Sequence, residues 1–416
     1  MNTMPSPLPE KRAFVTVAII AVIALVAGLL YATHLGDRLR YPDEQDYVAL
    51  ARSLHHEGAY ALGDGVPTAY RPPGYAFVLA GASRLSDSVT AYRLLNVLFL
   101  TLSILLAACL VRREHGLAAG AVAAALVLLY PVNLYTAGTL YPQTLGTVGL
   151  LLLLLGWQRI RRGATWPACG LGILSGAMVL TVPAFVFACG WIAAWSAIRR
   201  RLGVGVLVAW GLGVAVLMAP WAVRNYGALG AFVPISTNSG INLLLGNSEN
   251  TTPNAGVNVD IRHYRKAAAG LDEVRRNRQF TRDAIGWVRE NPGAAATLYV
   301  RKFLNYFNYR NELFVKGEAS PWRDALMLTT YVPLLLLVLV RFVPRIRVRL
   351  TSFEWLLLGV YVLNGAFQAI FFTRIRHRVP FDALLVCLAA PLVWRGMVAV
   401  RERLGRNPAR SGGQDG

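Results

Sequence analysis

The sequence predicts an all-α polytopic membrane protein with about ten transmembrane helices and two large extracytoplasmic loops. The chain has 416 residues, of which 55% are hydrophobic, and its mean hydropathy is +0.44. The apolar residues form long runs with few charges, and a run of about 20 such residues spans a bilayer core of about 30 Å. Together these observations exclude an ordinary soluble domain.

Ten apolar runs are candidate spans. The fifth and sixth are short, and Thr181-Val182-Pro183 separates them. Because Pro183 interrupts helical hydrogen bonding, one broken helix is an alternative to two separate spans. The candidate spans are residues 13–32, 92–111, 117–134, 141–158, 166–181, 183–198, 203–220, 324–341, 354–372 and 379–396.

The formal net charge of +20 is explained by arginine clusters that follow several of these spans. No nucleic-acid-binding motif is recognised, so we interpret the charge as a signal of membrane orientation and expect no nucleic-acid partner. The positive-inside bias places the clusters and both termini in the cytoplasm, although strict alternation over ten spans is not expected to place every cluster inside. The clusters begin at Arg112, Arg159, Arg199, Arg341 and Arg395.

Four regions follow from this topology. Residues 1–220 form an N-terminal membrane module that contains the first outer loop, 33–91, and residues 221–323 form a second outer region. Within the second region, helices are expected at 272–290 and 294–310. Residues 324–400 form the C-terminal membrane helices. Residues 401–416 are rich in Gly, Asn, Ser and Arg and are predicted to be a disordered cytoplasmic tail.

A short helix is predicted directly after the first span, because Pro42 and the following acids favour a first helical turn. Tyr47, Leu50 and Leu54 follow at helical spacing and place Asp43 within about 40° of an apolar stripe. A carboxylate on such a face is costly without a partner or a task. Asp43 is therefore either a general base or a capping residue paired with arginines.

Two further segments carry polar residues in a constrained setting. Tyr70 and Arg71 precede Pro72-Pro73, which fixes an extended backbone that holds them for a ligand or simply forms a stiff connector. The segment 373–378 places Arg374, Arg376 and Arg378 outside, against the positive-inside bias. If it is extended, its alternate residues point to one side, which favours an anion-binding cluster over lipid-anchoring arginines.

These motifs together resemble the GT-C membrane glycosyltransferases, in particular the bacterial relatives of protein O-mannosyltransferases and aminoarabinose transferases. The Asp43-Glu44 pair, followed by Ala69 to Tyr75, resembles their first outer loop. Pro220 to Asn247 is similar to their second outer loop, and Arg374 to Pro380 is similar to an arginine-rich signature before their last span.

The resemblance implies a GT-C-like fold and a transferase that moves a sugar from a polyprenyl-phosphate donor to a lipid, glycan or protein acceptor. The reaction would occur at the outer face of a bacterial cytoplasmic membrane. Asp43 matches the proposed base, and Glu44 would orient Asp43 or the acceptor. Arginines suit the donor phosphate because they bind its oxygens bidentately. The candidate phosphate ligands are Arg71, Arg224, Arg374, Arg376 and Arg378. The other substrate-binding candidates are Asp46, Tyr70, Asn225, Asn238 and His377.

One position departs from the family pattern. Many relatives carry an acid at the start of the fourth span, where this chain has Gln143. Because a neutral amide is a poorer ligand than a carboxylate for a hard divalent ion, we expect no metal and no other cofactor. Arginines would then neutralise the leaving phosphate.

Two alternative functions remain open: a flippase or transporter of lipid-linked glycans, and a polymerase or ligase of such glycans. A transporter is usually marked by charged residues within its spans, and the apolar runs here hold few. The Asp43-Glu44 loop, by resemblance, argues against a polymerase or ligase.

Overall fold

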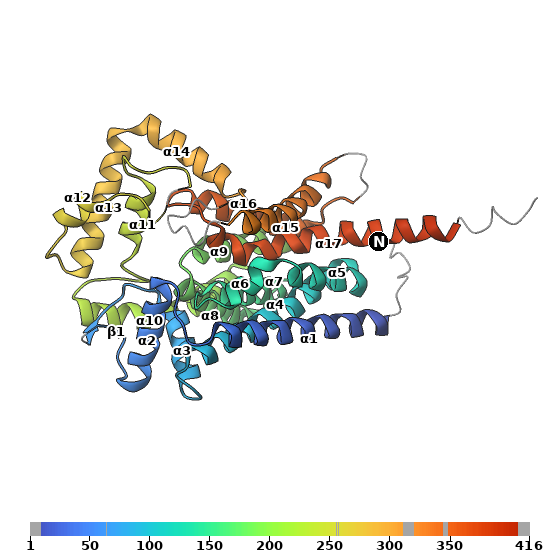
Figure 1. Ribbon diagram of the computed structural model, residues 1–416, viewed down its shortest axis with the longest axis horizontal. Coiled ribbons are helices and arrows are strands. Elements are labelled where there is room, and N and C mark those ends of the chain that lie inside the picture. The colour runs from blue at the N-terminus through green and yellow to red at the C-terminus, as the bar shows by residue number, and fades with distance from the viewer. Residues whose placement is uncertain are drawn as a thin grey trace, which may run out of the picture.

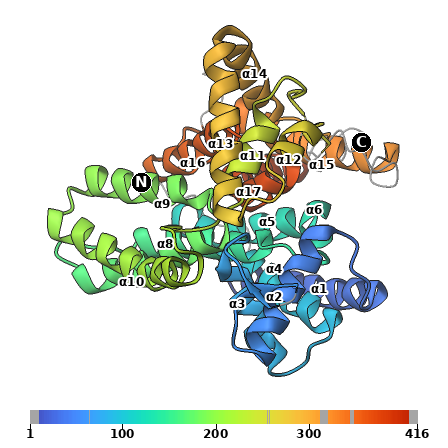
Figure 2. The same cartoon turned by 90° about the vertical axis from the view of Figure 1, so that its left-hand side faces the viewer.

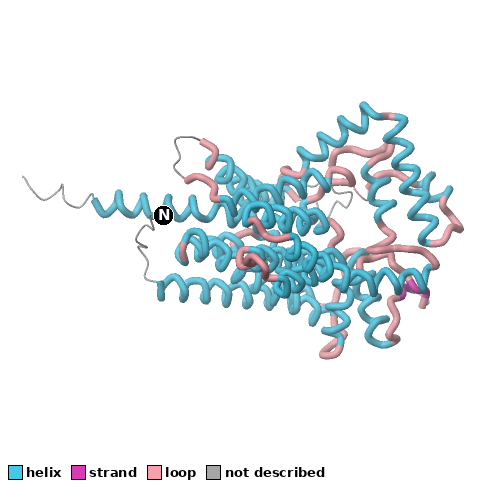
Figure 3. The backbone as a smooth tube through the Cα atoms, turned by 180° about the vertical axis from the view of Figure 1, so that it is seen from behind, coloured by secondary structure: helices cyan, strands magenta, loops and turns pink. Residues whose placement is uncertain are grey.

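The computed structural model describes residues 10–63, 65–254, 256, 258–310, 320–343 and 348–406. Its long helices run side by side as a bundle, with a lobe of shorter helices and a small β-hairpin at one end (Figures 1 and 3). The bundle helices are α1 (Glu10–Leu35), α4 (Val89–His115), α5 (Leu117–Leu128), α6 (Pro131–Ala137), α7 (Gln143–Trp157), α8 (Thr165–Thr181), α9 (Phe185–Arg200), α10 (Val204–Leu229), α15 (Pro321–Val340), α16 (Ser352–Gln368) and α17 (Ile375–Arg406).

The lobe combines two segments that are far apart in the sequence. The first contains α2, the hairpin and α3, and the second contains α11 to α14; both lie at the same end of the bundle, which we call the lobe end (Figure 2). Their elements are α2 (Pro42–His56), β1 (Ala61–Leu62), β2 (Val66–Pro67), α3 (Pro73–Ser83), α11 (Ser239–Gly246), α12 (Arg262–Ala267), α13 (Glu273–Glu290) and α14 (Pro292–Asn305).

The protein is an integral membrane protein by the length and composition of its helices. Five described helices are long and apolar enough to cross a bilayer: α1, α4, α10, α15 and α17. The helices α5 and α6 form a sixth candidate, bent by 61°. Since α7 and α8 are apolar but shorter, the count of ten spans remains a prediction.

All ten predicted spans form helices. The arginine clusters lie at those ends of the helices that point away from the lobe. Hydrogen bonds join the ends that lie away from the lobe: Arg113 at the end of α4 bonds Gln158 after α7, and Arg200 at the end of α9 bonds Ile160. His115 likewise contacts Glu354 at the start of α16. If α5 and α6 count as one span and α8 and α9 as two, alternation of the helices would bring all five clusters to the end away from the lobe. The span count, and with it the cytoplasmic placement of the clusters, stays a prediction.

Close packing between α8 and α10 depends on glycine. A Cβ atom added to Gly172 would lie 2.0 Å from the carbonyl oxygen of Trp210, and one added to Gly213 would lie 2.1 Å from that of Cys169. Small residues allow membrane helices to approach this closely. This contact fixes α8, whose last residue, Thr181, lines the cavity described below.

Several predicted boundaries were wrong. The helix α10 continues through Pro220 to Leu229, because a proline in a bundle helix is tolerated when neighbours satisfy the freed carbonyl. The predicted loop 373–378 is helical from Ile375. The predicted tail is helical as far as Arg406, and residues 407–416 lie outside the described residues. The helices predicted at 272–290 and 294–310 correspond to α13 and α14.

Candidate active site

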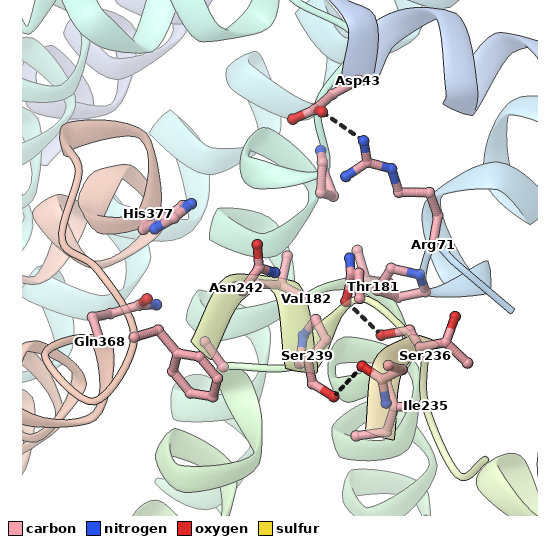
Figure 4. Close-up of a pocket in the computed structure, with 18 of the residues that line it drawn as sticks. Asp43, Arg71, Thr181, Val182, Ile235, Ser236, Ser239, Asn242, Gln368 and His377 are labelled. Carbon is pink, nitrogen blue, oxygen red and sulfur yellow. Dashed lines mark hydrogen bonds and ion pairs between the residues drawn. The ribbon is translucent and has the colours of Figure 1, made fainter. Parts of the chain in front are cut away.

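A cavity of about 450 Å³ lies where the lobe meets the bundle. We call it the central cavity. Its walls come from α2 and the Arg71 loop, from the lobe-end termini of α7, α8, α9, α16 and α17, and from α11 and α13. Figure 4 shows Asp43 and Arg71 on one side of the cavity and His377 and Gln368 on another.

Asp43 is held between two arginines in this cavity. Its Oδ1 accepts a hydrogen bond from Nη2 of Arg71 at 2.5 Å, and its Oδ2 accepts one from Nη1 of Arg376 at 2.8 Å. Burial raises the pKa of Asp43, but the positive charges of Arg376 and Arg71 lower it below its usual value. The carboxylate is therefore ionised and held in a fixed position. The interpretation of Asp43 as a general base is therefore compatible with its interpretation as a partner of arginines.

Glu44 positions the helix that carries Asp43. The fully buried side chain accepts bonds from the backbone N–H groups of Arg40 at 2.7 Å and Tyr41 at 3.1 Å, which satisfies the start of α2. Its other oxygen accepts the N–H of Leu140 at 3.0 Å, which ties α2 to the segment before α7. Glu44 does not line the central cavity, and its contacts favour orientation of Asp43 over orientation of the acceptor.

The loop that carries Arg71 is fixed at several points. Asp46 accepts bonds from Nε and Nη2 of Arg71 at 3.0 and 2.7 Å, and the hydroxyl of Tyr60 donates to the Arg71 carbonyl at 2.9 Å. Asp46 therefore orients Arg71 and is absent from the cavity lining. Tyr70 lies over the Arg71 guanidinium at 5.0 Å and lines a neighbouring cavity.

The three arginines before the last span do not form a one-sided cluster, and that prediction was wrong. Residues two apart on a helix differ by about 200°, so Arg376 and Arg378 point in different directions because α17 begins at Ile375. Arg376 and His377 line the central cavity. Arg374 instead lies near Asn258, with 3.4 Å between Nη2 and Oδ1.

Arg378 belongs to a buried network inside the bundle. It forms an ion pair with Asp382 at 2.9 Å and donates to the carbonyls of Tyr306 and Asn308. Tyr130 donates to the same carboxylate at 2.8 Å. Neither Arg378 nor Asp382 lines the central cavity. The network is thus a buried charge pair with polar partners, and it fixes the start of α17.

Arg224 and Asn225 lie on α10 and do not line the central cavity. Arg224 donates to the carbonyls of Tyr60 at 2.6 Å and Thr68 at 2.7 Å. Asn225 is buried and donates to the carbonyl of Val233 at 2.8 Å. Three candidates predicted from the sequence lie in the second outer region: Arg224, Asn225 and Asn238. Of these three described residues, Asn238 lines the central cavity and the other two do not.

Sequence reasoning did not select many of the residues that the fold adds to the central cavity, among them Tyr141, Gln368 and Arg278. Tyr141 lies with its ring 5.2 Å from the Arg376 guanidinium, Gln368 ends α16, and Arg278 projects from α13. The dense charge of residues 272–290 was the one available signal for Arg278. Tyr141 and Gln368 lie in segments that resemble any other span end.

A second, apolar cavity of about 600 Å³ shares Thr181 with the central cavity. We call it the apolar groove. It runs between α3, α7, α8 and α10 and is lined mainly by aliphatic and aromatic side chains, including Phe77, Leu145, Met178 and Trp221. A cavity lined, among the described residues, by one carboxylate and three arginines therefore adjoins the apolar groove.

The residues of the central cavity fit a divalent ion poorly. Among described residues, Asp43 is the one carboxylate in its lining, and both oxygens of Asp43 accept bonds from arginines. Gln143, at the start of α7, offers a neutral amide oxygen, whereas hard ions prefer several carboxylate ligands. One described group has metal-like spacing, formed by His55, His56 and Asp87, and it lies outside this lining.

Neither a protein-family model nor a curated protein matches the chain. Among solved structures, the chain is similar to ArnT from Cupriavidus metallidurans bound to undecaprenyl phosphate, with a TM-score of 0.44 and 15% identity over 92% of this chain and 79% of that chain. It is also similar to the apo state of the same protein, with a TM-score of 0.42 and 16% identity over 92% and 77% of the two chains.

Proposed function

We propose that this protein is a membrane glycosyltransferase that takes a sugar from a polyprenyl-phosphate donor. The observation that carries the proposal is the ionised Asp43 between Arg71 and Arg376, in a cavity that adjoins an apolar groove. A polyprenyl phosphate has an apolar tail and an anionic head. The apolar groove suits the tail, and the two guanidinium groups suit the phosphate.

The arginines have donors left for a phosphate. Within the described residues, the side-chain hydrogen bonds of Arg71 use Nε and Nη2, and those of Arg376 use Nε and Nη1. Because a guanidinium has five N–H donors, the remaining terminal nitrogen of each arginine is available to a ligand. One pair of cations therefore serves both Asp43 and the donor phosphate.

The reaction follows from these positions. An acceptor hydroxyl oxygen attacks the anomeric carbon, and its proton goes to Asp43. The bond between the anomeric carbon and the phosphate oxygen breaks, and its electron pair stays on the polyprenyl phosphate. Arg71 and Arg376 stabilise the charge that develops on that oxygen. No step requires a nucleotide or a metal.

The arrangement of the bundle supports a reaction at the extracytoplasmic face. The arginine clusters gather at the end away from the lobe, and the positive-inside bias assigns that end to the cytoplasm. With an even number of spans, both termini would then be cytoplasmic. The lobe and the central cavity would face outward, in a bacterial cytoplasmic membrane.

The proposal is tested with purified protein in vesicles that contain a radiolabelled polyprenyl-phosphate sugar and an envelope lipid extract. We expect release of polyprenyl phosphate together with a labelled product. Asp43→Asn keeps the size of the side chain and removes its basicity, which lowers turnover by about 10²–10⁴. Movement of intact donor across the vesicle membrane without sugar transfer would support the flippase alternative and refute the proposal.

A further inference from the structure

A third cavity, of about 460 Å³, lies in the lobe beside the central cavity. We call it the lobe cavity. It is lined by Tyr70 of the first lobe segment and by residues of α11, α12 and α13 of the second. Thr237 and Asn277 line both this cavity and the central cavity. The two cavities are therefore neighbours that share a wall.

Tyr70 stands between the lobe cavity and the catalytic candidate. The Tyr70 ring lines the lobe cavity and lies over the Arg71 guanidinium, 5.0 Å from the ring centre. Arg71 in turn bonds Asp43 at 2.5 Å. A ligand on the other face of Tyr70 would therefore have both the ring and the Arg71 guanidinium between it and Asp43. Aromatic rings are also suitable surfaces for the apolar faces of sugars.

The lining of the lobe cavity favours a negatively charged ligand. Arg265 of α12 and Arg276 of α13 contribute two guanidinium groups, and Arg276 also donates from Nη2 to the carbonyl of Leu271 at 2.9 Å. Glu273 is the one carboxylate in the lining. Its oxygens accept bonds from Thr68 at 2.6 Å, from the Ala69 N–H at 2.9 Å and from Thr237, so it is engaged in joining the two lobe segments.

The surrounding segment has the same sign of charge. Residues 261–290 contain eight lysines and arginines and four acids. Such a surface raises the local concentration of anions.

We propose that the lobe cavity binds the acceptor, and that the acceptor is an anionic glycan or glycolipid that carries phosphate or carboxylate groups. Arg265 and Arg276 bind the acidic group, and the sugar ring rests against Tyr70. The receiving hydroxyl reaches past Thr237 and Asn277 to Asp43, where it loses its proton as described above. This inference rests on the proposed function, since it assigns the second substrate of the same reaction.

The test measures binding without donor, so that it does not depend on turnover. The probes are N-acetylglucosamine 1-phosphate and uncharged N-acetylglucosamine, titrated into protein in nanodiscs and followed by calorimetry. We expect the phosphorylated probe to bind at least about tenfold more tightly, which corresponds to about 1.4 kcal/mol. The double variant Arg265→Gln/Arg276→Gln should lose this preference.

A matched control removes the same charge from α13 outside the lobe cavity. Arg282→Gln/Arg289→Gln should keep the preference, and so should Arg71→Gln, which tests binding in the central cavity. No binding of either probe, equal binding of both, or loss of the preference only in Arg71→Gln would overturn the inference. Binding with the expected pattern, but without sugar transfer in vesicles, would instead refute the proposed glycosyltransferase activity.

Discussion

Replacing Arg71 with glutamine should move the acid limb of the pH–rate profile to higher pH. In the native protein, burial raises the pKa of Asp43, and the charges of Arg376 and Arg71 lower it below its usual value. Arg71→Gln removes one of the two cations and leaves the burial unchanged. Asp43 then binds a proton at a higher pH, and a base that is protonated cannot accept the proton of the acceptor.

The size of the shift follows from the geometry. Two unit charges about 4 Å apart interact by about 4 kcal/mol at an effective dielectric constant of about 20, and one pKa unit corresponds to about 1.4 kcal/mol. The pair lies between side chains that are 15% and 23% exposed, so screening is incomplete. An adjacent arginine typically lowers a carboxyl pKa by about 1–3 units. We expect the acid limb to rise by that amount.

The assay is the initial rate of polyprenyl phosphate release in vesicles between about pH 4 and pH 8, at donor concentrations well below KM. Under these conditions kcat/KM reports the ionisation of the free enzyme. Arg52→Gln is the control, because Arg52 is an exposed arginine on α2 that bonds a carbonyl and not Asp43. If the acid limbs of Arg71→Gln and the native protein coincide, Asp43 is not the group whose ionisation controls transfer.

Three further predictions use paired variants. Arg376→Lys should slow transfer while expression stays normal, because lysine cannot bind a phosphate bidentately. Arg378→Lys should instead lower the apparent Tm, because it disturbs the buried ion pair with Asp382. The reverse pattern would contradict the assignment of Arg376 to the site. Lys302 is buried and donates to the carbonyls of Gly246 and Phe371. Lys302→Met should therefore lower the apparent Tm by about 5 °C or more, and Lys266→Met, at an exposed position, should not lower it. Equal effects of the two variants would refute a structural role for Lys302. In a cysteine-free background, Lys266→Cys should react with an impermeant thiol reagent in intact cells and Arg162→Cys should not; labelling of the Arg162 position would reverse the proposed orientation.

Much of the membrane architecture could be predicted because its signals are local. An apolar run of sufficient length becomes a helix wherever it occurs, since the bilayer leaves no other partner for its backbone groups. The short helix from Pro42 was predictable for a similar reason, because proline, acids and apolar spacing lie within four turns. The placement of Asp43 on the apolar stripe of this helix follows from those few residues, whereas the end of the helix at His56 comes from the structure.

The residues that complete the site depended on long-range packing. Arg376 was a candidate from sequence, but its neighbours Arg374 and Arg378 were equally plausible, and their sequence gives no helical phase until the start of α17 is known. Arg224 is of the residue type that binds phosphate, yet from α10 it donates to the Tyr60 and Thr68 carbonyls of the first lobe segment. Such a choice depends on where a distant loop folds.

The sequence by itself determined the membrane class, the helical segments and the Asp43 and Arg71 motifs, because hydrophobicity, proline and helical spacing act over a few residues. Only the tertiary structure decided which cations face Asp43 and which cavity adjoins them. Asp43 and Arg376 are 333 residues apart and meet at 2.8 Å. That distance is set by the packing of α2 against α3 and of α17 against α5, α7 and α16, and no local pattern encodes the relative placement of these helices.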